Sequence, residues 1–342
     1  IGDATGFWAD DLEDYSDNVK YQCHCHVHGG ECDPMPPRPR YACWPDDLWG
    51  AYDMESWRLG GNSASALCGD LDGDGDMDVV TVELDHDWAG ESTDHSEILV
   101  NDGVGSGGAF NRPGREATGF TREHARGWNE GDLGGALLDF DNDGRLDVLI
   151  LSSAYPDTYS LLYRQLDDGT FQEVGLQAGA RVHHGIGATL IDYDRDGDHD
   201  LVVGTATRGW DAGEDPPRPE ADFMYLFRND VGQDRNRVMH ALEGAGPPGA
   251  NRSAVGARVE VRVGDRLMVR EVMAGEGHDG YQHDPLLIVG VGDACTVDEV
   301  AVRWPNRDQT VTAIADVPAN YVLVVHETEG YSFQTLDEHV GR

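Results

Sequence analysis

The chain has 342 residues, of which 39% are hydrophobic, and its formal net charge at pH 7 is −39. This length suits about two domains. So acidic a chain offers no basic patch, which argues against nucleic-acid binding. It contains no run of about 18 apolar residues, so the sequence predicts no membrane span.

The composition favours an all-β protein rich in turns, because it combines 44 Gly and 15 Pro with few long helical periodicities. Lys20 is the single lysine, so the basic residues are nearly all Arg. An acidic surface poor in lysine suits a saline environment, where salt screens self-repulsion. A GC-rich genome that favours Arg over Lys explains the same bias, and the sequence leaves both explanations open.

Residues 1–60 are dense in aromatic residues, Pro and Cys and lack clear periodicity, which predicts a disulfide-stapled cap or an extended arm. The even number of cysteines fits up to three disulfides in an oxidising compartment and therefore an exported protein, although the pairing is open. The six cysteines are Cys23, Cys25, Cys32, Cys43, Cys68 and Cys295. No signal-peptide pattern is recognisable, and residue 1 is a candidate for a mature N-terminus.

Three histidines alternate within this segment, at His24, His26 and His28. On an extended backbone they point to one side, as ligands of Zn²⁺ or Cu²⁺ would. Their spacing matches neither a zinc finger nor a haem-attachment motif. A disulfide knot with exposed histidines is the alternative reading.

An acidic loop recurs at residues 70–78 (loop 1), 139–147 (loop 2) and 192–200 (loop 3). Each copy has carboxylates at positions 1, 3, 5 and 9 and Gly at position 6, and an apolar run follows. The carboxylates are Asp70, Asp72, Asp74 and Asp78 in loop 1, Asp139, Asp141, Asp143 and Asp147 in loop 2, and Asp192, Asp194, Asp196 and Asp200 in loop 3.

This pattern indicates calcium, a hard cation that takes six to eight oxygen ligands, whereas Mg²⁺ prefers octahedral sites that keep several waters. Gly at position 6 permits a sharp bend, which aims the backbone carbonyl of position 7 at the ion, in Asp76, Arg145 and Asp198. Position 12 lacks the Glu of an EF-hand. A solvated acidic turn is the alternative for one copy, but three copies in the same phase predict about three Ca²⁺ ions.

The loops lie in a repeated pattern of strands within residues 61–230, and their first residues are 69 and 53 positions apart. A strand of small residues precedes each loop, an apolar strand buried on both faces follows it, and a third strand then ends in a turn. Repeats of this length predict β-propeller blades. They resemble the FG-GAP/VCBS family, which implies calcium loops and a propeller as in integrin α chains. Closing a ring needs at least four blades, so further blades would come from residues 1–60, from 104–130, or from a partner.

Residues 231–330 change to half-buried alternating strands, which predict a small antiparallel β-sandwich. Three segments resemble the ASPIC/UnbV domain: 251–259, 300–305 and 320–327. In that resemblance, Asn306-Arg307 stands where a Ser/Asp-Gly turn is expected. The resemblance implies an exported bacterial protein. Residues 331–342 are predicted to be a polar tail.

His183 and His184 precede loop 3, which places a candidate ligand site near the mouth of a central channel, with a polar turn as the alternative. No G-x-S-x-G, HExxH or phosphate-binding Gly loop is present, so the motifs argue against an enzyme without deciding the question. We therefore expect an exported calcium-binding protein that acts in binding, scaffolding or surface assembly. Its partners would be proteins or carbohydrates, or further copies of itself. The alternative is a metalloenzyme or redox component with Cu or Zn at His24–His28.

Overall fold

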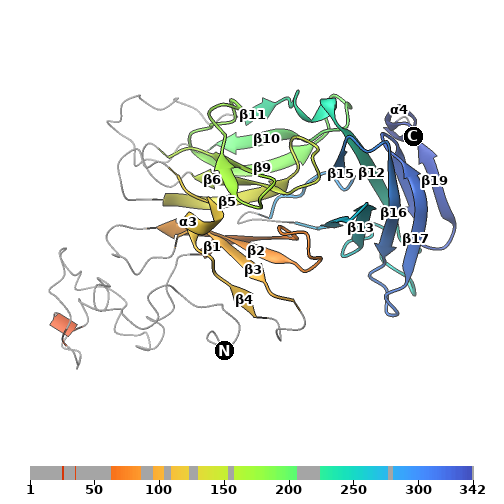
Figure 1. Ribbon diagram of the computed structural model, residues 1–342, viewed down its shortest axis with the longest axis horizontal. Helices are drawn as coiled ribbons and strands as arrows, with labels where there is room; N and C mark the ends of the chain where they lie inside the picture. The colour runs from red at the N-terminus through yellow and green to blue at the C-terminus, as the bar shows by residue number, and fades with distance from the viewer. Residues whose placement is uncertain are drawn as a thin grey trace.

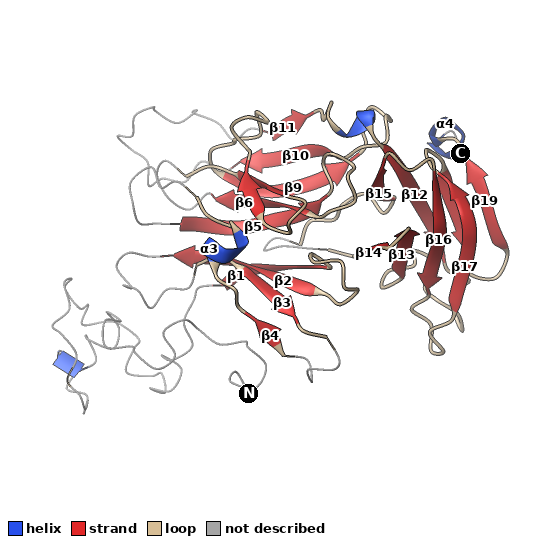
Figure 2. Ribbon diagram, in the orientation of Figure 1, coloured by secondary structure: helices blue, strands red, loops and turns tan. Residues whose placement is uncertain are grey.

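The computed structural model describes residues 25–26, 35, 63–85, 95–103, 109–122, 130–152, 158–205, 224–275 and 280–340. Within these residues the chain is almost entirely β-strand, as predicted, with two short α-helices, α3 (Arg115–Thr118) and α4 (Leu336–Val340) (Figure 2). No helix in the described residues has the length and apolar character needed to cross a membrane. The predicted N-terminal arm lies almost wholly outside the described residues.

The three predicted repeats each form an antiparallel sheet (Figure 1). Repeat 1 consists of β1 (Ser63–Gly69), β2 (Asp78–Asp85), β3 (Ile98–Asn101) and β4 (Phe110–Asn111). Repeat 2 consists of β5 (Glu130–Leu138), β6 (Asp147–Ser152), β7 (Leu161–Gln165) and β8 (Phe171–Glu173). Repeat 3 consists of β9 (Gly185–Ile191), β10 (Asp200–Thr205) and β11 (Met224–Phe227). Because the end of β2 pairs with the start of β5, repeats 1 and 2 form one continuous sheet.

The central strand β6 is buried on both faces, as its continuous apolar sequence predicts. Val148 and Ile150 pack in a cluster with repeat 1, whereas Leu149 and Leu151 pack in a cluster with repeat 3. All four side chains have no exposed surface. Since side chains alternate along a strand, β6 holds its neighbours face to face in a propeller-like stack. The described residues contain three such sheets and no fourth.

The C-terminal residues form a sandwich of two four-stranded sheets (the sandwich). One sheet has the order β15 (Leu287–Gly292), β12 (Asn236–Glu243), β18 (Val322–His326), β19 (Gly330–Gln334). The other has the order β14 (Arg266–Glu271), β13 (Arg258–Val263), β16 (Thr296–Arg303), β17 (Val311–Pro318). Buried valines from both sheets and Trp304 form the core. The strands pair antiparallel except for β12 and β18, which run parallel.

The predicted polar tail is wrong, because residues 331–342 contain most of β19 and all of α4. β19 pairs with β18 from Val322↔Gln334 to His326↔Gly330. It escapes prediction because Tyr331 and Phe333 are exposed, so the strand shows no apolar face that meets a core. Its strand conformation comes with the backbone pairing to β18.

Candidate metal centres

Each acidic loop joins the first two strands of its repeat and folds around its position-1 carboxylate. Both oxygens of that carboxylate accept backbone N–H groups of the same loop. Asp70 accepts from Gly73 and Gly75, Asp139 from Asp143 and Gly144, and Asp192 from Asp196 and Gly197, at 2.9–3.2 Å. Three copies of one local sequence therefore give one local structure.

The position-9 carboxylate ties each loop to the third strand of its repeat. Asp78 accepts the N–H of Leu71 at 2.7 Å and that of Asn101, at the end of β3, at 2.8 Å. The corresponding donors are Phe140 and Gln165 for Asp147, and Tyr193 and Asn229 for Asp200. Position 9 is thus structural as well as a candidate ligand.

The predicted bend at position 6 is present, since the φ angles of Gly75, Gly144 and Gly197 are 96°, 94° and 87°. Position 4 is also left-handed, with φ of 75° at Gly73, 53° at Asn142 and 65° at Arg195. Sequence reasoning missed this second bend, because only Gly and Asn, and not Arg, favour that conformation.

The loops bring three carboxylates together in each repeat, those of positions 1, 3 and 9. The groups are Asp70, Asp72 and Asp78; Asp139, Asp141 and Asp147; and Asp192, Asp194 and Asp200. Within each group, one oxygen per residue lies within 4.8 Å of the others. The position-5 carboxylates lie outside these groups and accept the N–H of position 7, as Asp74 does from Asp76 at 2.8 Å. An all-oxygen cluster of this kind can hold a hard cation.

The electrostatics of the loops also fit a cation. Burial raises the pKa of Asp78, Asp139 and Asp192 to about 6 each, against the effect of their backbone hydrogen bonds. Burial and the neighbouring carboxylate of Asp196 raise the pKa of Asp198 to about 8. Neither oxygen of the buried Asp198 carboxylate receives a hydrogen bond. Arg270 lies 3.8 Å from Asp139 and partly offsets the effect of burial on its pKa. A bound cation would add positive charge beside all of these carboxylates.

The loops differ in what covers them. Asp72 and Asp74 of loop 1 are exposed, whereas every aspartate of loop 2 is buried. Asp141 in loop 2 is also contacted by two guanidinium groups, those of Arg164 at 2.5 Å and Arg235 at 3.1 Å. A cation in loop 2 would share this carboxylate with both arginines.

The remaining predicted ligands are not brought together by the described residues. His24 and His28 lie outside them, and His26 is half-buried beside the buried Cys25. The transition-metal site therefore stays a prediction. Cys68 and Cys295 carry exposed thiols, which leaves the other four cysteines for the predicted disulfides.

His183 and His184 lie between β8 and β9, away from the cavity described below. The ring of His183 stacks edge-on against Tyr159, and its Nδ1 lies 3.0 Å from the carbonyl oxygen of Thr158. His184 is buried with φ of 61°. These contacts give both histidines local structural roles, and the predicted channel-mouth site stays untested.

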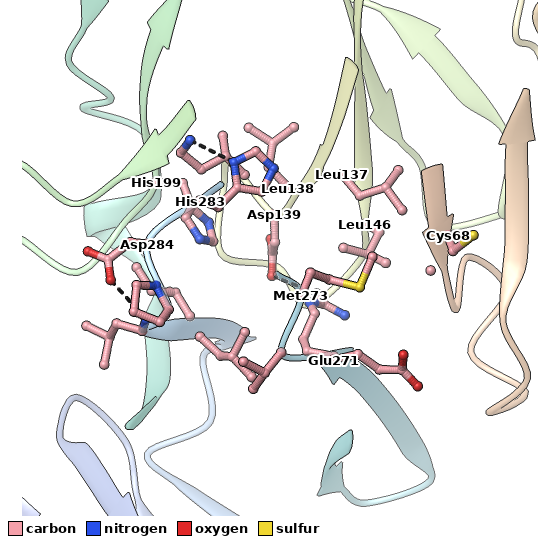
Figure 3. Close-up of a pocket in the computed structure, with 18 of the residues that line it drawn as sticks. Cys68, Leu137, Leu138, Asp139, Leu146, His199, Glu271, Met273, His283 and Asp284 are labelled. Carbon is pink, nitrogen blue, oxygen red and sulfur yellow. Dashed lines mark hydrogen bonds and ion pairs between the residues drawn. The ribbon is translucent and has the colours of Figure 1, made fainter. Parts of the chain in front are cut away.

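A cavity of about 110 Å³ lies between the repeats and the sandwich (Figure 3). Its polar lining includes Asp139, His199, Arg270, Tyr281 and His283. Burial, together with Arg270 and His283, lowers the pKa of His199 to about 3 and keeps its ring neutral. Tyr281 and His283 reach the repeats from between β14 and β15, a contact that no local sequence signal predicts.

Two protein families match parts of this chain. The FG-GAP-like repeat family matches residues 139–203, which run from loop 2 to the middle of β10, and the ASPIC and UnbV family matches residues 247–332. The chain is an FG-GAP repeat protein with a C-terminal UnbV domain. Repeat 1 lies outside the FG-GAP match, yet its loop has the same hydrogen bonds and bends as the two loops inside it.

Comparison with solved structures returns a candidate cell adhesion protein from Bacteroides uniformis. The two chains are 9% identical, with a TM-score of 0.16, over 60% of this chain and 90% of that chain. At this TM-score the likeness carries no argument. No curated protein matches the chain significantly.

Proposed function

We propose that this FG-GAP/UnbV protein is an exported, calcium-stabilised binding or scaffolding protein, with one Ca²⁺ ion in each acidic loop. The observation that supports this is one carboxylate geometry repeated in three loops. The oxygens are hard ligands from flexible side chains, which suit Ca²⁺ better than transition metals or Mg²⁺. The grouped side chains of positions 1, 3 and 9 would hold each ion, and the position-5 side chain and position-7 carbonyl, which the sequence also predicts as ligands, would complete the site.

Calcium in these loops is structural rather than catalytic. Bound Ca²⁺ supplies the positive charge that lets several buried carboxylates ionise together. The chain itself orients the ligands, since Asp78 and its equivalents connect each loop to the third strand of its repeat. Each ion would therefore stabilise a whole repeat.

Metal content and melting temperature test the calcium assignment. Protein purified without added metal and then equilibrated with Ca²⁺ should hold about three calcium ions per chain, and EDTA should lower its melting temperature markedly. Unchanged melting and protease resistance in EDTA would refute it. Stoichiometric copper or zinc in the same elemental analysis would instead support the alternative site at His24–His28.

An exposed aromatic patch on the sandwich supports the binding role. Tyr321, Tyr331 and Phe333 are 41%, 54% and 39% exposed, and the ring of Phe333 contacts both tyrosine rings edge-on. Aromatic residues are enriched where proteins meet partners. Screening the protein and a Tyr331→Ser variant against glycans and surface proteins tests this role. Binding that the substitution does not weaken would exclude the patch.

A further inference from the structure

The acidic loops all face the sandwich, and an arginine of the sandwich contacts the backbone of each loop. Arg258 donates to the carbonyl of Gly75 in loop 1 and Arg237 to that of Asp196 in loop 3. Arg266 donates to the carbonyl of Asp143 in loop 2 at 2.5 Å. These carbonyls belong to position 5 or 6 of each loop, one or two residues before the position-7 carbonyl that the sequence predicts as a cation ligand.

Loop 2 is contacted most closely. The N–H of Gly290 in β15 donates to Asp139 Oδ2 at 3.0 Å, and the N–H of Gly292 donates to the carbonyl of Asn142 at 3.1 Å. The regular pairing of β12 with β15 shifts at this point, between Asn236 and Arg237. The end of β15 is therefore bonded to a candidate metal ligand as well as to its own sheet.

A second contact closes the interface on the side of the cavity. Tyr281 packs against β5 and β9 so closely that a Cβ on Gly134 would lie 2.0 Å from its Oη, and one on Gly187 would lie 3.2 Å from its ring. His283 Nδ1 accepts the N–H of Leu190 at 3.1 Å. The small residues of these two strands thus accommodate a side chain from beyond the repeats.

These contacts join the cation sites and the domain interface through the same loop atoms. A bound cation would hold positions 5 and 7 in place, which orients the carbonyls between them toward the arginines. Without it, mutual repulsion among the carboxylates opens the loop and disperses those acceptors. Coupling of this kind is reciprocal. If bound calcium raises the equilibrium constant for docking by some factor, docking of the sandwich raises the affinity for calcium by the same factor.

We propose that calcium binding by the loops and docking of the sandwich onto the repeats are one coupled equilibrium, so that removing calcium releases the sandwich. The inference rests on the calcium function proposed above. It makes the acidic loops a calcium-dependent docking surface for the UnbV domain of the same chain.

The docked state can be followed by the hydrogen-exchange rates of two amides, measured on the full chain in Ca²⁺ and in EGTA. The amides of Gly290 and Gly292 should exchange about tenfold faster in EGTA. The amides that pair β13 with β16, inside the sandwich, should stay protected. If those amides lose protection equally, chelation unfolds the sandwich, and the release mechanism is wrong.

A calcium titration of arginine variants separates this inference from the calcium function. Arg266→Ala should raise the apparent Kd for calcium about tenfold. The matched control is Arg262→Ala, because within the part of the chain that the structure describes Arg262 pairs with Glu260 and Glu299 on the sandwich surface and with no loop atom, so the Kd should stay unchanged. The coupling would be refuted if neither variant altered the Kd for calcium and the amides of Gly290 and Gly292 stayed protected in EGTA. The proposal that the loops bind calcium would then still stand. Absence of calcium binding by the wild type would overturn both proposals.

Discussion

Substituting Gly290 by alanine perturbs the interface without changing any candidate ligand. An added Cβ would lie 2.3–2.5 Å from the backbone C, Cα and O atoms of Asn142 in loop 2. These are backbone atoms of a buried loop, so they cannot rotate away as a flexible side chain could. Relief requires β15 to move away from loop 2, which also breaks the bond from Gly290 N–H to Asp139.

The cost follows from these two linked effects. Overpacking of this kind costs about 1–3 kcal/mol, and a hydrogen bond to a charged group contributes about 1.5–3 kcal/mol. The same movement of β15 relieves the steric clash and breaks the hydrogen bond, so the two energies are not additive. We expect a loss of about 3 kcal/mol, equivalent to a fall in melting temperature of roughly 5 °C.

Thermal melting in Ca²⁺ and in EGTA is the assay. The loss should be seen in Ca²⁺, where the sandwich is docked, and should nearly vanish in EGTA, where it is already released. Gly204→Ala is the control, since a Cβ at that position in β10 would meet nothing within 4 Å. An equal loss in both buffers would show that Gly290 matters only for packing within the sandwich, and would refute the reasoning.

Three further predictions concern the loops and the core of the repeats. Asp78→Ala leaves two backbone N–H groups without their acceptor and removes a candidate ligand. The free energy of unfolding measured in urea should fall by about 3 kcal/mol. Elemental analysis should find one calcium ion fewer per chain, and full calcium stoichiometry would contradict the ligand assignment. Asp78 and Asp139 have raised pKa values of about 6 each. Between about pH 4 and pH 6 the metal-free folded chain therefore keeps protons that the unfolded chain releases. The stability of the metal-free protein falls as pH rises through this range. Calcium displaces those protons, so the rise in melting temperature on adding calcium should grow from about pH 5 to about pH 7; a constant rise would contradict the proton competition. Arg122→Ala leaves the fully buried Asp132 carboxylate without its bidentate partner and should cost about 3–5 kcal/mol in chemical unfolding. Arg228→Ala breaks an exposed pair and should cost far less. Similar costs for the two variants would show that the buried pair is not special.

The strands around the loops could be predicted because their signals are local. Alternating or continuous apolar runs specify β2, β6 and β10, and Asn-Asp-Gly and Asp-Asp-Gly turns follow the third strands of repeats 1 and 2. The sandwich strands β13 to β16 follow from the same periodicity. β17 and β19 could not be predicted in this way. Half of the residues of β17 and four of the five residues of β19 are exposed, and both strands depend on pairing, with β16 and β18 respectively.

The contacts of the C-terminal sandwich with the repeats could not be predicted either. Nothing near Tyr281 in sequence shows that Gly134 and Gly187 lie against its ring. The small residues of β5 and β9 are visible in the sequence, but what packs against them is not. The side chain that crowds them comes from far along the chain and is visible only once the fold is formed.

The sequence by itself determined the three acidic loops. Each position-1 carboxylate accepts N–H groups three to five residues away within its own loop, so nine residues specify most of the loop conformation. Only the tertiary structure decided that the loops face a second domain and that loop 2 is buried beneath it. The reason is sequence separation: Arg258 lies 183 residues from Gly75, and Arg266 lies 123 residues from Asp143. No local sequence pattern can predict a hydrogen bond between an arginine and a carbonyl so far away along the chain. Through these hydrogen bonds the three separate loops contact one common domain.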